Sequence, residues 1–159
     1  MERNDDILTN TIIAESYCLK CRKWTYEIVE HKCSKRYCII IDGVMVGIVD
    51  RIYELGIIPN EAGFLLNCVD NKSKIYNVRL YIYLSKGLNC EVLGKLPEGW
   101  QYYREPEGKI YMLGFSDHKH YKGVFAAKER VKEIAKKFEV FLDTIDKNLV
   151  NALLLLSDG

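Results

Sequence analysis

The 159-residue sequence lacks the features that would place it in several large classes of protein. No apolar run approaches the roughly 20 residues that a membrane-spanning helix requires. The formal net charge is only +1, so no overall electrostatic field draws the chain towards nucleic acids or membranes. With 48% hydrophobic and 28% charged residues, the composition is typical of a folded globular protein rather than a disordered one. A chain of this length predicts a single domain over residues 1–159.

Sequence motifs of several common enzymes are also missing. There is no glycine-rich phosphate loop, no Gly-x-Ser-x-Gly nucleophile turn and no His-Glu-x-x-His metalloprotease motif. The first six residues are polar and acidic, unlike a signal peptide, so we expect a cytoplasmic protein. In that compartment the six cysteines would be reduced thiols rather than disulfides.

Alternation of apolar residues and turn residues predicts strands in both halves of the chain. The predicted strands are 11–17, 24–30, 37–41, 63–69, 75–84, 100–104 and 109–115. Two segments have alternative interpretations. Asp42-Gly43 is either a hairpin turn or the start of a helix over 44–55 that Gly56 ends. The helical stripe that begins near Val124 either continues as one long helix or gives way to two strands over 139–156.

An internal repeat favours one alternative in each case. A shift of 76 positions aligns Trp24 with Trp100, Tyr26 with Tyr102 and Leu66 with Leu142. If the first copy (about 11–84) is strand–helix–strand–strand, the second (about 91–156) is the same, which predicts strands over 139–156. One copy alone does not bury both its sheet face and its helix, so the two copies would pair.

We therefore predict an α+β fold. It is a duplicated strand–helix–strand–strand unit with pseudo-two-fold symmetry, in which an antiparallel sheet carries two helices. Pairing of the copies leaves a cleft at the axis, which is a common place for a ligand.

This layout resembles the GyrI-like, or effector-binding, domain family. The family includes the ligand-binding domains of MerR-type and AraC-type multidrug regulators, and stand-alone relatives. The resemblance covers about residues 24–156 and lies in the strand Trp100–Arg104, the turn Pro106-Glu107-Gly108, the strand 109–113 and an aromatic–Glu strand at Phe138–Leu142. It implies an aromatic-lined cavity between the halves, with a glutamate, here Glu139, that pairs with cationic, lipophilic ligands.

The residue types agree with such a site. A carboxylate in an apolar pocket needs a cationic partner, and aromatic faces add cation–π attraction of about 0.5–2 kcal/mol each. The predicted function is a small-molecule binding module for lipophilic, cationic or aromatic compounds, acting as a sensor or scavenger. The alternative is that Glu139 lies on the surface and that the aromatics are ordinary sheet packing. The predicted ligand-binding residues are Glu139, Trp24, Tyr26, Tyr81, Tyr83, Trp100, Tyr102, Tyr111 and Phe141.

An enzymatic function is one alternative to this binding module. Some members of the family hydrolyse reactive electrophiles, and in such an enzyme Glu139 would act as general base.

Residues 1–23 hold no winged helix, so we expect no direct DNA binding from this chain alone. The expected partner is a small molecule, with a separate DNA-binding domain or protein partner and no membrane.

The cysteines suggest a zinc site in the first third of the chain. Cys18-x₂-Cys21 followed by Cys33 and Cys38 has the content of a tetrahedral zinc site, with His31 as an alternative ligand. Six lysines and arginines lie nearby, which would suit a zinc-ribbon adaptor that binds nucleic acid or protein. The alternative is that these cysteines are free thiols packed as small apolar side chains.

Overall fold

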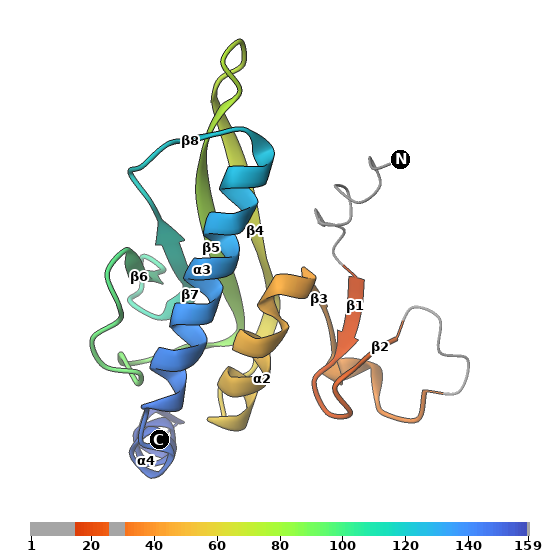
Figure 1. Ribbon diagram of the computed structural model, residues 1–159. Helices are drawn as coiled ribbons and strands as arrows, with labels where there is room; N and C mark the ends of the chain where they lie inside the picture. Colours follow the sequence, from red (N-terminus) through yellow and green to blue (C-terminus); the bar gives the residue numbers. More distant parts are fainter. Residues whose placement is uncertain (1–14, 26–30, 159) are drawn as a thin grey trace.

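The computed structural model describes residues 15–25 and 31–158, and it shows an α+β protein, as the sequence predicts (Figure 1). Its strands are β1 (Glu15–Cys18), β2 (Lys23–Trp24), β3 (Cys38–Ile41), β4 (Pro59–Asp70), β5 (Ile75–Leu88), β6 (Trp100–Arg104), β7 (Ile110–Ser116) and β8 (Tyr121–Lys122). Its helices are α2 (Val46–Glu54), α3 (Val124–Asp143) and α4 (Lys147–Asp158), with the short 3-10 turns η1 (Lys35–Tyr37) and η2 (Gly43–Met45). Among these described helices, none is both long and apolar enough to cross a membrane.

The strands form one mixed sheet. Its order is β2-β1-β3-β4-β5-β7-β6, and β8 pairs with β5. Every pair is antiparallel except β3–β4, which is parallel with Ile40 opposite Glu61 and Ile41 opposite Ala62. The parallel pair arises because α2 connects β3 to β4 as a crossover. The sheet is therefore mostly antiparallel rather than antiparallel throughout.

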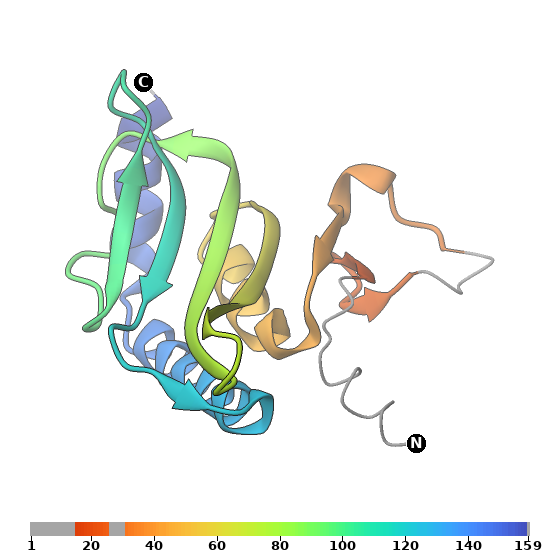
Figure 2. The same ribbon diagram turned by 90° about the horizontal axis from the view of Figure 1, so that it is seen from above.

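Helices α2 and α3 lie side by side on one face of this sheet (Figures 1 and 2). The segment after β3 forms η2 and α2 rather than a hairpin, so the helical interpretation of residues 44–55 is confirmed. Helix α2 buries Ile48, Val49 and Ile52, which lie on one side of the helix. It ends before Gly56, whose φ of 96° breaks the helix at little steric cost.

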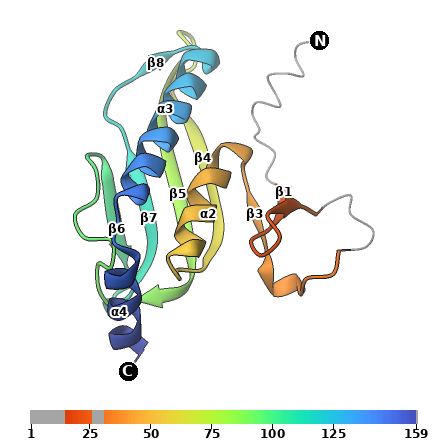
Figure 3. The same ribbon diagram turned by 60° about the horizontal axis from the view of Figure 1, so that its bottom comes forward.

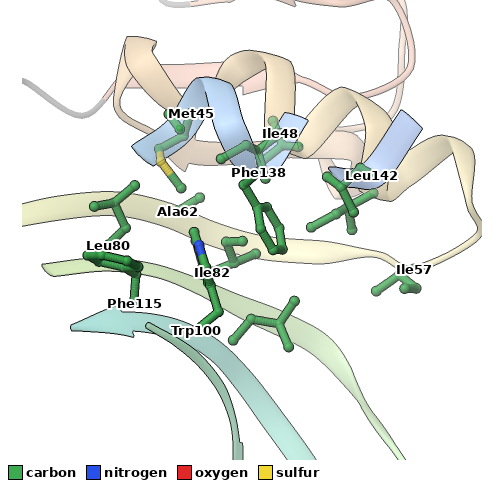
Figure 4. Packing of buried hydrophobic residues seen from close by; sticks show 14 of the residues in the cluster. Met45, Ile48, Ile57, Ala62, Leu80, Ile82, Trp100, Phe115, Phe138 and Leu142 are labelled. Carbon is green, nitrogen blue, oxygen red and sulfur yellow. The ribbon is translucent and has the colours of Figure 1, made fainter. Parts of the chain in front are cut away.

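The core lies between these helices and the sheet. Figure 4 shows Phe138 and Leu142 of α3 beside Ile48 of α2, all above Leu80 and Ile82 of β5. Each of these five side chains is at most 3% exposed. Because β5 turns alternate residues towards the helices, the residues between them face the opposite side of the sheet, which none of the described helices covers.

The prediction of two strands over 139–156 is wrong. Residues 124–143 form one helix, and 147–158 form a second one, which lies at the end of the molecule beyond α3 (Figure 3). The buried residues of α3 recur three or four positions apart, the helical period. Packing of that stripe on the sheet favours a continuous helix. Asp146 caps the start of the second helix, because its Oδ1 accepts hydrogen bonds from the N–H of Asn148 at 2.9 Å and of Leu149 at 3.3 Å.

The strand–helix–strand–strand order is present once, over residues 38–88. In residues 100–158 the strands precede both helices and none follows them, so the second copy is not reproduced. The pairs aligned by the 76-residue shift also differ in setting, because Leu66 lies on β4 and Leu142 on α3.

Candidate metal centre and tyrosine face

Four metal-binding side chains meet beside β1 and β2. The donor atoms of Cys18, Cys21, His31 and Cys33 all lie within 4.8 Å of one another. In a tetrahedral zinc site with Zn–S bonds of about 2.3 Å, neighbouring sulfurs lie about 3.8 Å apart. The four donor atoms are therefore close enough to hold one ion after their side chains move slightly towards a common centre.

The first two ligands belong to a tight turn. Cys18 ends β1, and its carbonyl accepts a hydrogen bond from the N–H of Arg22 at 2.8 Å. Arg22 adopts a positive φ of 60°, which returns the chain into β2. The turn also directs the N–H of Cys21 at the Sγ of Cys18, 3.4 Å away. Such N–H groups orient a metal-bound thiolate and stabilise its charge.

The other two ligands come from the segment before η1. His31 Nε2 lies 3.5 Å from the Sγ of Cys21, and Cys33 follows two residues later. Cys18 is buried and the other three residues are half-buried. An ion held by all four side chains would have no position left for water, which is the arrangement of structural rather than catalytic zinc sites.

The thiols influence one another electrostatically. Burial by itself raises the pKa of Cys18, but hydrogen bonds from the Cys21 N–H, from the Cys21 side chain and from His31 outweigh it and lower the pKa to about 7. The pKa of Cys33 is raised, first by burial and then by the neighbouring Cys18. The cluster therefore concentrates negative charge on Cys18, which a bound cation would stabilise.

His31 rather than Cys38 completes this set. The sequence prediction takes Cys38 as the fourth ligand and His31 as the alternative. Cys38 begins β3 directly opposite Cys18, but its sulfur lies outside the group of four donors. The difference follows from the fold, because β3 fixes Cys38 in the sheet while His31 lies before η1, in reach of the β1–β2 turn.

A second candidate site lies on the uncovered face of the sheet, opposite α2 and α3. Tyr81 and Tyr83 are neighbours there, with ring centroids 5.4 Å apart, and Tyr83 stacks on Tyr111 at 6.3 Å. The hydroxyl of Tyr81 donates to Glu61 Oε2 at 3.4 Å. Tyr81, Tyr83 and Glu61 border a shallow pocket of about 360 Å³, whose lining also includes Arg79, Tyr103 and Met112. Three of the predicted aromatic residues thus lie together.

Glu139 is not part of this face. It lies on α3 against Gly47 of α2, with its Oε1 3.5 Å from Arg51 Nη1 and 3.9 Å from Lys136 Nζ. Its side chain is only 17% exposed. The carboxylate has protein cations as partners, so this position suits helix–helix pairing better than ligand binding or general-base catalysis.

The remaining predicted aromatics are dispersed. Trp100 is in the core, stacked on Phe138 at 4.0 Å, and Phe141 contacts the same ring at 5.5 Å. The hydroxyl of Tyr102 donates to the carbonyl of Gly94 at 2.6 Å. Trp24 packs edge-on against Tyr17 in the N-terminal strands, and Tyr26 lies outside the described residues.

Sequence reasoning missed the carboxylate of the tyrosine face. Glu61 lies on β4 opposite Tyr83, and Gly63 lies opposite Tyr81. The alternation of Arg79, Tyr81 and Tyr83 with buried residues is visible in the sequence, and it marks one face of β5. Register alone brings Glu61 to that face, and register is a property of the sheet.

Comparisons with known proteins supply no relative for this arrangement. Neither the protein-family models, nor the curated proteins, nor the solved structures contain a match to this chain. The candidate sites therefore rest on their own geometry.

Proposed function

We propose that this chain is a zinc-binding adaptor, in which a structural Cys₃His centre orders an N-terminal module with a basic surface that contacts nucleic acid. The observation that carries the proposal is the convergence of the Cys18, Cys21, His31 and Cys33 donors within 4.8 Å. Three thiolates and one imidazole form a ligand set typical of structural zinc, and metals that prefer oxygen ligands fit it poorly.

Metal content tests the centre directly. We expect the purified protein to hold one zinc ion per chain, and its cobalt-substituted form to show the intense visible absorption of a tetrahedral thiolate site. Cys33→Ser should lower zinc content and melting temperature, because binding to the native state alone raises its stability. Cys68→Ser is the matched control, since Cys68 is exposed on β4 away from the donors. Metal-free protein that a chelator leaves unchanged would refute the centre.

The charge and the aromatic residue of the surface around the proposed centre support nucleic acid as the partner. Segments 18–23 and 31–38 carry six lysines and arginines and no acidic residue, although the whole chain has a net charge of only +1. All six are exposed, and only Arg22 among them forms an ion pair with a described residue, Glu54. Tyr37 lies between two of these cations, with Lys20 Nζ 5.2 Å and Arg36 Cζ 4.9 Å from its ring centroid. Clustered cations beside an aromatic ring are typical of surfaces that bind single-stranded nucleic acid.

Fluorescence anisotropy with a single-stranded oligonucleotide tests this partner. We expect binding that weakens steeply with salt, because phosphate contacts release counterions. Lys35→Gln should weaken binding, and Lys122→Gln on β8 should not, although both lysines are exposed. Equal effects of the two substitutions would contradict a specific surface.

The tyrosine face supports a second candidate function, the binding of a lipophilic cation. The specific observation is a carboxylate, Glu61, beside Tyr81 and Tyr83 in a pocket of about 360 Å³. A melting-temperature screen with tetraphenylphosphonium and a neutral analogue tests it. We expect a rise with the cation only, lost in Glu61→Gln and kept in Glu139→Gln. The same response in both variants would argue against Glu61 as the binding carboxylate.

A further inference from the structure

Four basic residues that the proposed function does not use lie near the edge strand β6. His118 and Lys119 follow β7, while Arg130 and Lys137 lie on α3. All four line a cavity of about 860 Å³ between the start of β6, the end of β7 and α3. The cavity lies beside the edge strand β6, at the opposite end of the sheet order from β1 and β2.

The base of this cavity is aromatic and well packed. Trp100 stacks on Phe138 with centroids 4.0 Å apart and meets Phe115 edge-on at 5.7 Å. Each of these three side chains is at most 7% exposed, so they hold the base rigid while presenting little surface. Gln101 and the half-buried Tyr103 add an amide and a phenol ring to the lining. The site thus offers the Tyr103 ring and polar groups together.

The charge of the cavity is positive once its internal pairs are considered. Asp117 accepts hydrogen bonds from Arg130 Nε at 3.0 Å and from the Tyr121 hydroxyl at 2.6 Å. That carboxylate is therefore compensated within the protein, and its side chain is only 7% exposed. Among the described residues, Lys137 and His118 have no hydrogen-bond or ion-pair partner and are exposed. Glu98 is the remaining acidic residue of the lining.

We propose that this cavity binds a small organic phosphate that carries a planar ring, as a mononucleotide does. Lys119, Lys137 and His118 approach from two elements and would share the charge of one phosphate group, a geometry suited to a dianion. The planar part would lie against the half-buried ring of Tyr103, where ring–ring contact adds attraction. This inference is independent of the zinc centre, and the cavity shares Tyr103 with the pocket of the tyrosine face.

An NMR titration of the full chain with AMP, adenosine and inorganic phosphate tests the proposal. We expect AMP to shift amide signals of residues 97–103, 115–119 and 130–138 in a saturable way, and adenosine and phosphate to bind several-fold more weakly. Lys137→Gln should weaken AMP binding about two- to fivefold, the effect of one exposed charge pair. Lys132→Gln is the matched control, because Lys132 is exposed on the same helix but paired with Glu129 and outside the lining.

Three results would overturn the proposal. These are shifts scattered over all surface lysines, AMP affinity no higher than that of phosphate, and equal affinity in wild type and Lys137→Gln. The amide spectrum itself shows whether each variant is folded, so a lost response is not confused with unfolding.

Discussion

Two aspartates, Asp117 and Asp42, are expected to respond in opposite ways to replacement by asparagine. The Asp117 side chain is 7% exposed, and Asp42 as a residue is also 7% exposed. Asp117 accepts hydrogen bonds from Tyr121, from Arg130 and from the Lys119 N–H. Asp42 accepts one, from the N–H of Phe64 at 3.1 Å, and has acidic Glu61 as its charged neighbour.

The hydrogen-bond partners of each aspartate determine how much its replacement changes the free energy of unfolding. Hydrogen bonds to a charged group contribute about 1.5–3 kcal/mol, and asparagine would lose at least one at Asp117 and place an amide N–H₂ against a guanidinium. We therefore expect Asp117→Asn to lower the free energy of unfolding at pH 7 by about 2–4 kcal/mol. Asp42→Asn keeps an oxygen for the Phe64 N–H and removes a buried charge, so its free energy of unfolding should stay within about 1 kcal/mol of wild type or rise.

The pH dependence of stability should differ in sign. Burial alone raises the pKa of Asp117, but its hydrogen bonds from Tyr121, Lys119 and Arg130 lower it overall. Its contribution is present above the unfolded pKa of about 3.9 and is lost as the pH falls through the lower folded value. The pKa of Asp42 is raised, mainly by burial. Its contribution is present below about pH 3.9 and is lost as the pH rises through the folded value.

Urea unfolding of wild type and both variants at pH 7 and near pH 3 measures these differences. The deficit of Asp117→Asn should shrink at the lower pH, while Asp42→Asn should improve relative to wild type as the pH rises. Glu129→Gln is the control for an exposed carboxylate, because Glu129 forms only a surface pair with Lys132. Equal losses for the two aspartate variants at pH 7 would refute the argument that their partners decide the outcome.

Four further substitutions test packing, backbone geometry and one buried hydrogen bond. Phe138→Ala should lower the free energy of unfolding by about 3–5 kcal/mol in urea, because the ring is fully buried against Trp100; a loss below about 1 kcal/mol would contradict that packing. Gly99→Ala should destabilise more than Gly94→Ala in thermal melts: both glycines have positive φ, but only at Gly99 would a Cβ strike Phe115, and equal losses would count against that contact. Tyr17→Phe should cost about 1–2 kcal/mol in urea, since its buried hydroxyl donates to Asp50 at 2.8 Å, and no change would argue against this bond.

The sequence alone determined the fold class and most of the strands. Residues 63–69, 75–84, 100–104 and 109–115 alternate and end at turn residues, and each lies within or beside an observed strand. The helix over 44–55 could also be predicted from the sequence, because its apolar stripe defines the buried face and Gly56 marks the end. The spacing of Cys18 and Cys21, with His31 and Cys33 further on, predicted a possible metal site, and its four candidate ligands are among the residues that the sequence analysis considered.

Tertiary structure decided what local patterns left open. Over 139–156 a short apolar run fits either a strand or a helix, and the core contacts of Phe138 and Leu142 selected the helix. That choice moved Glu139 from the predicted pocket to a helix pair with Arg51. Register in the sheet likewise brought Glu61 to the tyrosines, and the start of β3 at Cys38 left His31 as the fourth donor of the candidate centre. Each outcome depends on contacts between residues far apart in the chain, which local propensity does not encode.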